Sequence, residues 1–370
     1  SVQMALKNAG LIEDWNIGLN SNKMEWIENR HWLIAGRIPE NWMTEKQEKM
    51  ILECKGMDYK GIVMNNGKEA GRFENAFLPY KFDITAYLKE RNNSIVFVFK
   101  CPPENLAQIG WTSQIKDWKP RFNYGWDWVP RIVQTGIWDN VYIHAEKAHT
   151  AFLEQIQIIA GADKNKESGT LSIKAFPNAL ALKGKVKIEL LERNGRKVLE
   201  ESFPAKDLYS TKIWNKLAIK RWYPNGLGEQ PLYDFKLVLI DENGIESQFM
   251  EKKLGFRNLE WLPCKGAVAE ADPWICTVNN QSFFIQGINW TPILPNFADL
   301  KEEDYRKRLK IYQDIGINTI RIWGGGFPEK DWLYDICDEL GILIWQDFPL
   351  SSSGLENYPP EGEKEIYSIT

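Results

Sequence analysis

The sequence is poor in histidine and cysteine and has no long hydrophobic run. Its 370 residues include three histidines and five cysteines, and no two cysteines form a Cys-x-x-Cys pair. This composition argues against a zinc site, so we expect no metal and no cofactor. We expect buried thiols with at most one disulfide. The apolar runs, such as residues 283–288, are too short to span a membrane.

An excess of charge of one sign is also lacking. Lysine and arginine number 46 against 50 aspartates and glutamates, which gives a formal net charge of -4. Nucleic acid and anionic membrane surfaces are therefore excluded as main partners. No secretory signal begins the chain, and residues 1–6 resemble the middle of an amphipathic segment, so we expect an earlier natural start. The compartment stays open, with a periplasmic or secreted location favoured over a cytoplasmic one.

Aromatic residues, in contrast, are abundant, with seventeen tryptophans and seventeen phenylalanines. Most should be core residues, but indole rings also stack well on the apolar faces of sugars. A chain of this length exceeds one hydrophobic core, and we expect two or three domains.

Residues 1–149 alternate apolar and polar positions in short runs. The clearest strands are 34–38, 50–54, 62–64 and 94–99, and Asn66-Gly67 is a strong hairpin turn. The pattern predicts a β-sandwich of the jelly-roll type. Residues 101–139 interrupt it with a long, tryptophan-rich segment, which predicts a functional loop.

Residues 150–258 predict a second sandwich. The expected strands are 152–159, 170–176, 185–192, 197–203, 211–220, 231–240 and 245–253. Asn194-Gly195 suggests a type I′ turn, and Asn243-Gly244 turns the last pair. Seven strands in roughly 100 residues indicate an immunoglobulin-like domain.

Residues 259–370 change to a strand–helix rhythm. Strands are expected at 283–289, 319–323 and 342–345, with one helix capped by Asp299 and ended by Gly316. Pro328 should lie in the first turn of the next helix, which Gly341 ends. Either a doubly wound sheet or a (β/α)8 barrel fits. A barrel needs about 250 residues, so this would be its first three βα units only.

Functional groups of parallel α/β folds project from the carboxyl ends of the strands. Arg321 lies on an otherwise apolar strand, so we expect it to be buried. A buried guanidinium needs an anionic partner, most economically a carboxylate on a neighbouring strand. A purely structural ion pair is the alternative. The glycines at 324–326 lack the spacing of a phosphate loop. We expect them to turn the backbone sharply so that Trp323 faces a pocket.

Asp127 lies between Trp126 and Trp128, an arrangement that suits a sugar. The rings would stack on its C–H faces while the carboxylate accepts hydrogen bonds from vicinal hydroxyls. The alternative is an aspartate that stabilises a turn beside core rings. No two carboxylates suggest a catalytic dyad. Asp347 and the acidic positions 356, 361 and 363 lie in the right region, but the last three are expected to be solvated.

These motifs resemble the β-mannosidase branch of glycoside hydrolase family two over essentially the whole chain. The matching segments are RIWGGG at 321–326, YDICDELGI at 334–342, WQDF at 345–348, GWDWVPR at 125–131, GIW at 136–138, FLPYKFDIT at 77–85 and WYPNGLGEQPLY at 222–233. The branch usually has glycine where this chain has Val129. After Phe348 the chain also departs from the family's usual residues, which leaves the aglycone preference open.

The resemblance implies a sugar-binding-like jelly roll, an immunoglobulin-like domain and the start of a catalytic barrel. It implies a β-mannoside oligosaccharide or glycan as ligand and an exo-acting, retaining hydrolase as the parent protein. Trp126 and Asp127 would contact the terminal mannose, and Trp323 would form a wall of that subsite. Arg321 would orient the nucleophile, and Asp347 would be a polar residue of the pocket.

Both catalytic glutamates would lie beyond Thr370, so the chain alone should be inactive. Two other readings stay open. One is another family 2 exo-glycosidase, such as an exo-β-glucosaminidase or β-galactosidase. The other is a non-catalytic carbohydrate-binding protein.

Overall fold

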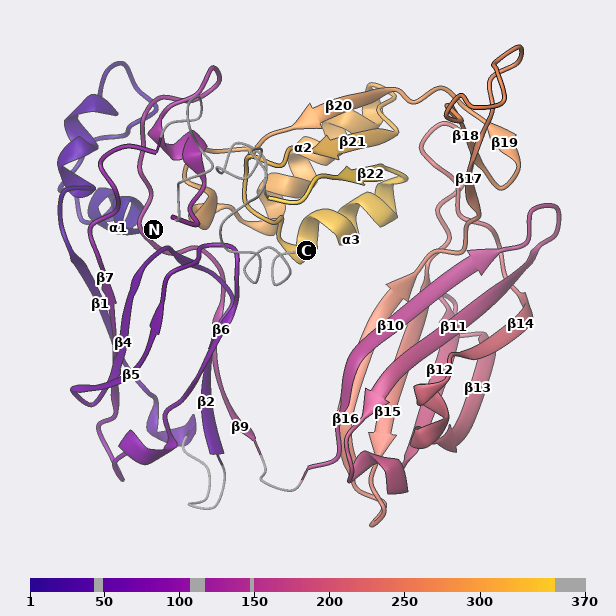
Figure 1. The fold of residues 1–370 in the computed structure, drawn as a ribbon, viewed down its shortest axis with the longest axis horizontal. Helices are drawn as coiled ribbons and strands as arrows, with labels where there is room; N and C mark the ends of the chain where they lie inside the picture. Colours follow the sequence, from indigo (N-terminus) through magenta and orange to yellow (C-terminus); the bar gives the residue numbers. More distant parts are fainter. Residues whose placement is uncertain (43–48, 107–116, 147–149, 350–370) are drawn as a thin grey trace.

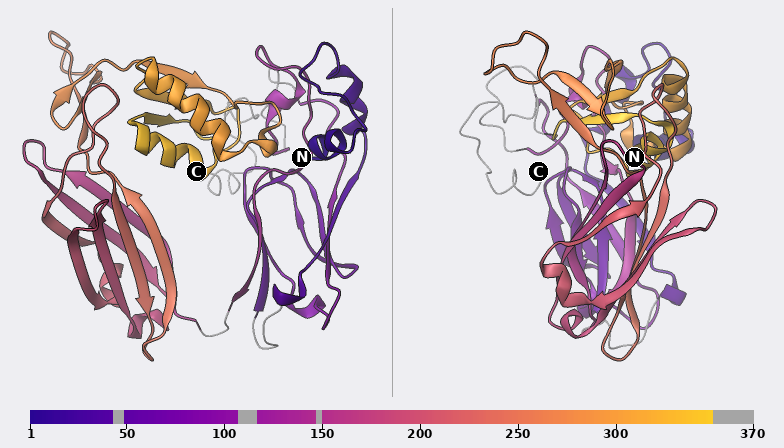
Figure 2. Two further views of the ribbon diagram at one scale, coloured as in Figure 1. Left: turned by 180° about the vertical axis from the view of Figure 1, so that it is seen from behind. Right: turned by 90° about the vertical axis from the view of Figure 1, so that its right-hand side faces the viewer.

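The structure is a computed structural model that describes residues 1–42, 49–106, 117–146 and 150–349. Two β-sandwiches stand side by side, and a smaller α/β module lies across one end of both (Figure 1). The view from behind shows the same arrangement, and in the side view one sandwich lies in front of the other (Figure 2). The described part of the chain is mainly β-sheet, and it contains no helix long and apolar enough to cross a membrane.

The first sandwich has two antiparallel sheets. One contains β1 (Trp32–Arg37), β7 (Ser94–Phe99), β4 (Gly61–Asn65) and β5 (Lys68–Phe73), and the other β6 (Tyr80–Asp83), β2 (Lys49–Cys54) and β9 (Val141–Glu146). A short pair, β3 (Met57–Asp58) and β8 (Gly136–Ile137), adjoins them. Helix α1 (Val2–Asn8) precedes the sandwich, and the short 3-10 helices are Asn22–Ile27, Glu40–Trp42, Thr85–Tyr87 and Arg121–Tyr124. The predicted sandwich is confirmed.

The predicted turn between β4 and β5 is also present. Asn66 and Gly67 have φ angles of 51° and 81°, the left-handed pair that a type I′ turn requires. Alternate residues of β4 and β7 are buried, so a single core forms between the two sheets.

The second sandwich contains all seven predicted strands. Its sheets are β10 (Leu153–Ala162), β11 (Ser168–Pro177) and β14 (Lys212–Ala218), against β13 (Lys197–Pro204), β12 (Lys185–Glu192), β15 (Tyr233–Ile240) and β16 (Glu246–Leu254). Short 3-10 helices occupy Ala181–Lys183 and Ala205–Tyr209. Every second residue of β15 is buried, and this burial is the physical reason for the alternation of apolar and polar residues in the sequence.

The predicted type I′ turn at Asn194-Gly195 is wrong. Only Gly195 has a positive φ, at 86°, and its N–H donates to the Glu192 carbonyl at 2.8 Å. The connection is a longer loop that ends in a left-handed glycine, with a register shift in the adjoining strands. Gly244 repeats this pattern at the predicted last turn, with a φ of 82°.

The α/β module begins with a three-stranded antiparallel sheet that the sequence did not predict. Its strands are β17 (Leu259–Leu262), β18 (Ile275–Val278) and β19 (Gln281–Ser282). Asn279 and Asn280, with φ angles of 51° and 66°, make the turn before β19. The parallel strand that was predicted from residue 283 therefore starts later, as β20 (Gly287–Trp290).

β20 pairs in parallel with β21 (Thr319–Ile322), which pairs in parallel with β22 (Leu343–Gln346). The helices α2 (Glu302–Asp314) and α3 (Asp331–Leu340) alternate with these strands, after the 3-10 helix Phe297–Asp299. The apolar strand residues Ile288, Ile320 and Ile344 share one hydrophobic cluster with both helices. The opposite face carries the row Asn289, Arg321 and Trp345, which pair with one another in register.

Two predicted helix starts are wrong. Asp299 does not cap α2. The Lys301 N–H donates to the Asp304 carboxylate at 2.9 Å, and α2 begins two residues later than expected. α3 begins at Asp331 rather than at Pro328. Both predicted ends are confirmed, because Gly316 and Gly341 have φ angles of 87° and 79°.

Three of the five cysteines are buried, whereas Cys101 and Cys264 are exposed, and all five are free thiols. The expectation of buried thiols therefore fails at two positions. Burial raises the pKa of the Cys54 thiol to about 12.

A buried carboxyl lies between β20 and the helices. Glu329 accepts hydrogen bonds from Trp290 Nε1 and the Tyr305 hydroxyl, both at 2.8 Å. Burial raises the pKa of Glu329, although these bonds partly oppose the shift.

The second sandwich holds the helix ends of the module. Asn225 Nδ2 donates to the Gln313 and Ile317 carbonyls at 2.8 and 3.0 Å, and its backbone N–H donates to the Gly341 carbonyl at 2.7 Å. These carbonyls lie at the carboxyl ends of α2 and α3, where the helices leave acceptors unsatisfied. The segment at 222–233 is thus a docking element.

The first sandwich meets the same module through aromatic rings. Phe327 is stacked on Phe297 at 4.9 Å between ring centroids, and Trp138 lies 4.8 Å from Phe327. Trp138 also donates from Nε1 to the Ala76 carbonyl at 2.9 Å. One buried cluster therefore includes residues of both the sandwich and the module.

Candidate functional site

The carboxyl ends of the three parallel strands form one edge of the candidate site. Arg321 on β21 donates from Nη2 to Asp347 Oδ2 at 2.5 Å and from Nε to Oδ1 at 3.3 Å. Its Nη1 donates to Asn289 Oδ1 on β20 at 3.3 Å. Asp347 follows β22 directly, so the expected carboxylate partner on a neighbouring strand is present.

The expectation that Arg321 is buried is wrong. Its side chain is 45% exposed, and that of Asp347 is 21% exposed. Both helices cover the other face of the sheet, and within the described residues nothing encloses the guanidinium. A surface ion pair contributes about 0–1 kcal/mol to the stability of a fold. Stability alone therefore does not explain why Arg321 and Asp347 are paired at this position.

Trp323 lies just beyond β21, and its ring lies over the backbone of Gly325. A Cβ at Gly325 would be 2.1 Å from Cζ2 of that ring, which no real side chain allows. None of the three glycines at 324–326 has a positive φ. The predicted sharp turn is present, because residues 324–325 form a turn in which the Gly326 N–H donates to the Trp323 carbonyl at 3.4 Å. Gly325 also permits the close approach of the indole to the backbone.

The tryptophan-rich loop of the first sandwich reaches this edge. Gly125, with a φ of 105°, leads into a turn in which Trp126 and Val129 exchange backbone hydrogen bonds of 3.0 and 3.3 Å. Asp127 and Trp128 occupy the tip of that turn. Part of the long segment, residues 107–116 with Trp111, lies outside the described residues.

Trp126 stacks on Trp323, with ring centroids 6.4 Å apart and an interplanar angle of 19°. The stack joins residues almost 200 positions apart in the chain, one from each module. Trp126 is still 36% exposed, so one part of the pair is open to solvent. Offset rings at this distance form a favourable aromatic pair and a flat apolar wall.

Asp127 is exposed, and its carboxylate accepts no hydrogen bond from the part of the chain that the structure describes. The alternative of a turn-stabilising aspartate would require a bond to a nearby backbone N–H. The geometry does not support that alternative. A free carboxylate beside an exposed indole can accept hydrogen bonds from a ligand.

Sequence reasoning missed the supporting ring of Phe122. This side chain is fully buried, and its ring centroid lies 5.3 Å from that of Trp128 and 6.4 Å from that of Trp323. Trp128 also lines a cavity of about 150 Å³ beside Trp290 and Tyr312. The sequence signal was the density of aromatic residues after Pro120, but it did not distinguish supporting rings from exposed ones.

The structure thus brings the predicted residues together as two pairs. Trp126 stacks on Trp323, and Arg321 binds Asp347. No hydrogen bond or ring contact between described residues joins one pair to the other. Among those residues no group of histidines, cysteines and carboxylates could hold a metal ion. The acidic positions 356, 361 and 363 lie outside the described chain.

Comparisons with known proteins agree with this architecture. A family model described as glycosyl hydrolase 2 galactose-binding domain-like matches residues 1–139, and a model for glycosyl hydrolases family 2 matches residues 151–257. Curated relatives include β-mannosidase B of Thermothelomyces thermophilus, 26% identical, and β-mannosidase of Rattus norvegicus, 27% identical. Each alignment covers 97% of this chain and 42% or 43% of the relative.

Among solved structures, a β-D-mannosidase from Dictyoglomus thermophilum matches with a TM-score of 0.78 and 27% identity. That match covers 92% of this chain and 43% of the other. An exo-chitosanase from Amycolatopsis orientalis matches with a TM-score of 0.68 and 20% identity, over 94% of this chain and 39% of the other, which shows a shared fold. The chain spans less than half the length of these relatives.

Proposed function

Because this chain belongs to glycosyl hydrolase family 2, we propose that it is the N-terminal part of an exo-acting, retaining β-mannosidase. The relatives support this, since the chain aligns almost wholly with β-mannosidases more than twice its length. The observation that carries the proposal is the loop tip of the first sandwich, where Trp126 stacks on Trp323 and the exposed Asp127 accepts no hydrogen bond from any described residue.

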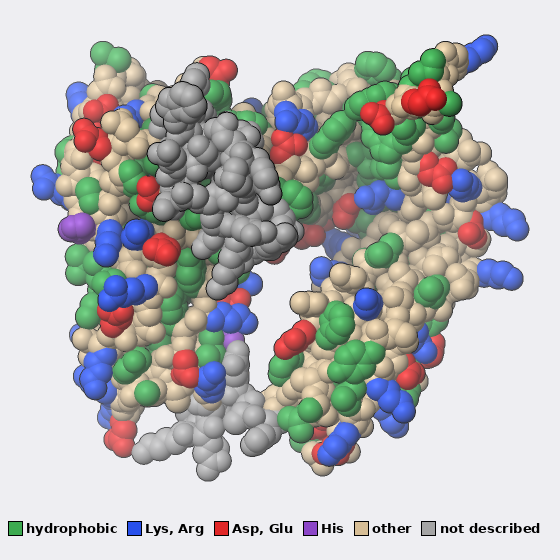
Figure 3. Space-filling view, viewed as in Figure 1, with side chains coloured by type: hydrophobic (Ala, Val, Ile, Leu, Met, Phe, Trp, Pro, Cys, Tyr) green, Lys and Arg blue, Asp and Glu red, His purple; other side chains and the backbone are tan. Residues whose placement is uncertain are grey.

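We divide the chain into domains at 1–149, 150–258 and 259–370. The family models at residues 1–139 and 151–257 support the first two of these domains. The third is the beginning of a (β/α)8 barrel, of which β20, β21 and β22 are the first three strands. An apolar groove of about 610 Å³ between the β17–β18 hairpin and the sheet supports a continuing barrel. Hydrophobic side chains gather over that hairpin in the space-filling view (Figure 3).

In this proposal the terminal mannose lies against the stacked indoles. Trp126 and Trp323 present apolar ring faces to its C–H groups, and Asp127 accepts hydrogen bonds from vicinal hydroxyls. The loop belongs to another domain than the barrel and would close one end of the pocket. Only a chain end then fits, which makes the enzyme exo-acting.

The reaction itself would use two glutamates from the sequence after Thr370. One attacks the anomeric carbon while the other protonates the leaving oxygen, and water then hydrolyses the glycosyl-enzyme with retention. Their carboxyl groups would lie about 5–5.5 Å apart. Arg321 would orient the nucleophile, and Asp347 with Asn289 would fix the guanidinium.

The Asp127→Asn variant of the full-length protein tests the role of the loop. Hydrogen bonds to a charged group contribute about 1.5–3 kcal/mol each, so kcat/KM for an aryl β-mannoside should fall by about 10- to 150-fold. The matched control is Asp272→Asn, an exposed aspartate on the β17–β18 connection, which should keep full activity. Equal activities of the two variants would remove Asp127 from the subsite.

The alternatives differ in simple observations. Another family 2 exo-glycosidase would prefer a β-glucosaminide or β-galactoside, and the fold match to the Amycolatopsis exo-chitosanase keeps this alternative in view. A non-catalytic carbohydrate-binding protein would lack a further barrel after Thr370. Reading the coding sequence beyond that residue separates this last alternative, because an enzyme needs an Asn-Glu after a fourth barrel strand.

A further inference from the structure

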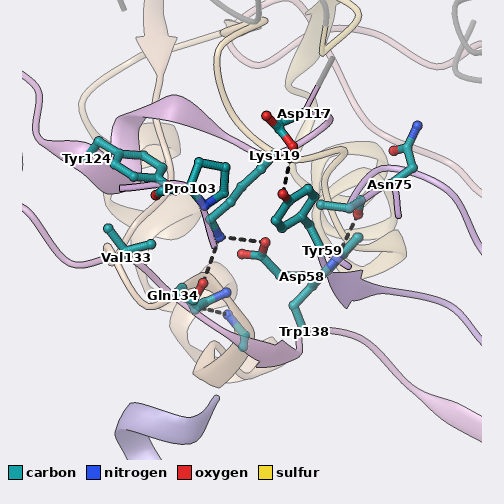
Figure 4. Close-up of polar contacts among 12 residues, drawn as sticks. Asp58, Tyr59, Asn75, Pro103, Asp117, Lys119, Tyr124, Val133, Gln134 and Trp138 are labelled. Carbon is teal, nitrogen blue, oxygen red and sulfur yellow. Dashed lines mark hydrogen bonds and ion pairs between the residues drawn. The ribbon is translucent and has the colours of Figure 1, made fainter. Parts of the chain in front are cut away.

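A buried ion pair lies at the base of the loop that carries Trp126 and Asp127. Lys119 Nζ lies 2.5 Å from Asp58 Oδ1, and both side chains are 0% exposed. The same ammonium donates to the Gln134 carbonyl at 2.7 Å. Lys119 thus reaches from one arm of the loop to β3 and to the other arm (Figure 4).

The hydrogen bonds of the loop form a ladder from this base to the tip. Lys119 bridges to Gln134 at the bottom, and the Ile132 N–H donates to the Asn123 carbonyl at 2.8 Å in the middle. Trp126 and Val129 close the tip with their two backbone bonds. A shift at the base would therefore reach the indole that stacks on Trp323.

Further contacts hold the two arms in place. The Tyr59 hydroxyl donates to Asp117 Oδ1 at 2.7 Å beside the outgoing arm (Figure 4). On the returning arm, Gln134 Oε1 accepts from the Ala298 N–H of the α/β module at 3.2 Å. The ion pair is thus connected through Gln134 to the module that carries Trp323.

The pair is poorly arranged for stability alone. Within the described residues Asp58 Oδ2 accepts no hydrogen bond, although it is buried. Burial raises the pKa of Asp58 and lowers that of Lys119, while the opposite charges partly offset both shifts. Buried ion pairs are weak stabilisers compared with apolar residues of the same volume, but they can specify one arrangement of the chain.

We propose that Lys119 and Asp58 are positioning residues that hold the sugar-binding loop on Trp323. The expected effect on catalysis rests on the proposed function, whereas the expected effect on the position of the loop does not. Neither residue would touch the substrate. Lys119 acts through its hydrogen bond to the Gln134 carbonyl. Asp58 keeps the Lys119 ammonium charged in the apolar interior and fixes its position.

Three variants of the full-length protein separate positioning from packing. Lys119→Met keeps the unbranched side chain but removes the tether and leaves Asp58 as an uncompensated buried charge. Lys119→Met/Asp58→Asn removes the tether and both charges. Asp58→Asn keeps an oxygen that accepts from Nζ, and so keeps the tether. The control Lys236→Met breaks a partly exposed pair with Glu251 on the second sandwich.

Three measurements are needed. The first is thermal stability, and the second is kcat/KM for an aryl β-mannoside. The third is the Trp126 signal, which is the near-ultraviolet circular dichroism spectrum of each protein minus the spectrum of the same protein with Trp126→Phe, and it reports the stack without any substrate.

We expect Lys119→Met to lose thermal stability and the double variant to regain most of it. Both should lose the Trp126 signal and at least ten-fold in kcat/KM, whereas Lys236→Met should stay within about three-fold. Asp58→Asn keeps an acceptor for the ammonium but removes the charge beside it, so its Trp126 signal and its kcat/KM should lie between those of the wild type and the double variant. Wild-type values for Asp58→Asn would show that Asp58 has no positioning role. A stable double variant with the full Trp126 signal would overturn the proposal, since the pair would then only pack the sandwich. If the wild type hydrolyses no β-mannoside but the signal follows the tether, the proposed function fails and the positioning role stands.

Discussion

A methyl group at Gly325 should separate the two stacked tryptophans. The Cβ of a Gly325→Ala variant would lie 2.1, 2.4 and 2.6 Å from three atoms of the Trp323 ring. A normal carbon–carbon contact needs about 3.5 Å, so the rigid ring must move by about 1.5 Å. The Trp323 ring must move away from the backbone of residue 325, and this movement disturbs its stack on Trp126, in which the ring centroids are 6.4 Å apart.

The magnitude follows from overpacking and from the lost ring pair. Forcing one extra carbon into a filled site costs about 1–3 kcal/mol, and an aromatic pair contributes about 0.5–1.5 kcal/mol. We expect the α/β module to unfold at lower temperature and the Trp126-dependent dichroism to disappear. In the full-length enzyme, kcat/KM for an aryl β-mannoside should fall by about ten-fold or more, since 1.4 kcal/mol corresponds to a factor of ten.

Gly326→Ala is the matched control. Its Cβ would meet only ordinary contacts, the nearest being Pro292 Cγ at 3.6 Å, and neither glycine has a positive φ. The entropic effect of alanine on the unfolded chain is the same at both positions. A folded Gly325→Ala protein with an unchanged Trp126 signal would refute the reasoning about the stack.

Three further predictions concern the fold. Asn225→Ala removes two hydrogen bonds to helix-end carbonyls and should lower the stability of the docked α/β module by about 1–3 kcal/mol. In limited proteolysis the module should then be cleaved earlier than in the wild type. Unchanged cleavage would contradict the docking role of Asn225. Glu329 has a raised pKa, so the folded state binds its proton more tightly than the unfolded chain, and stability should fall as pH rises from the ordinary glutamate range through the folded-state pKa. In thermal scans Glu329→Gln should lack this fall, and parallel pH profiles would argue against the assignment. Finally, Cys264 is exposed and should react with a thiol reagent at neutral pH. Cys101 should react more slowly than Cys264, because burial raises the pKa of its thiol and its Sγ donates to the Glu28 carbonyl. Cys54, with its pKa of about 12, should react only after unfolding, and rapid labelling of Cys54 in the folded protein would show that its burial is wrong.

The strands were predictable because their alternation is local. The strand at 185–192 was predicted with its observed bounds, since every second position faces the core. Turn details were less predictable. Asn194-Gly195 has the composition of a type I′ turn, but Asn194 instead accepts from the Arg196 N–H within a longer loop. Composition alone does not distinguish these two turns.

The residues of the candidate site could be proposed from the sequence, but their geometry could not. The strand ends and the indole–aspartate loop contain uncommon residues for their positions, so Arg321 and Asp127 were found from sequence. The stack of Trp126 on Trp323 joins segments almost 200 residues apart, and no local pattern encodes such a contact. The Lys119–Asp58 pair was missed for the same reason, because neither residue is unusual within its own segment.

The most direct test of the central claim is the substrate preference of the full-length protein. kcat/KM should be measured for aryl β-mannoside, β-glucosaminide and β-galactoside, with residues 1–370 alone as the comparison. We predict that the β-mannoside is the best substrate of the full-length protein and that residues 1–370 hydrolyse none of the three. A full-length enzyme for which the mannoside is the poorest substrate, or turnover by residues 1–370, would contradict the account.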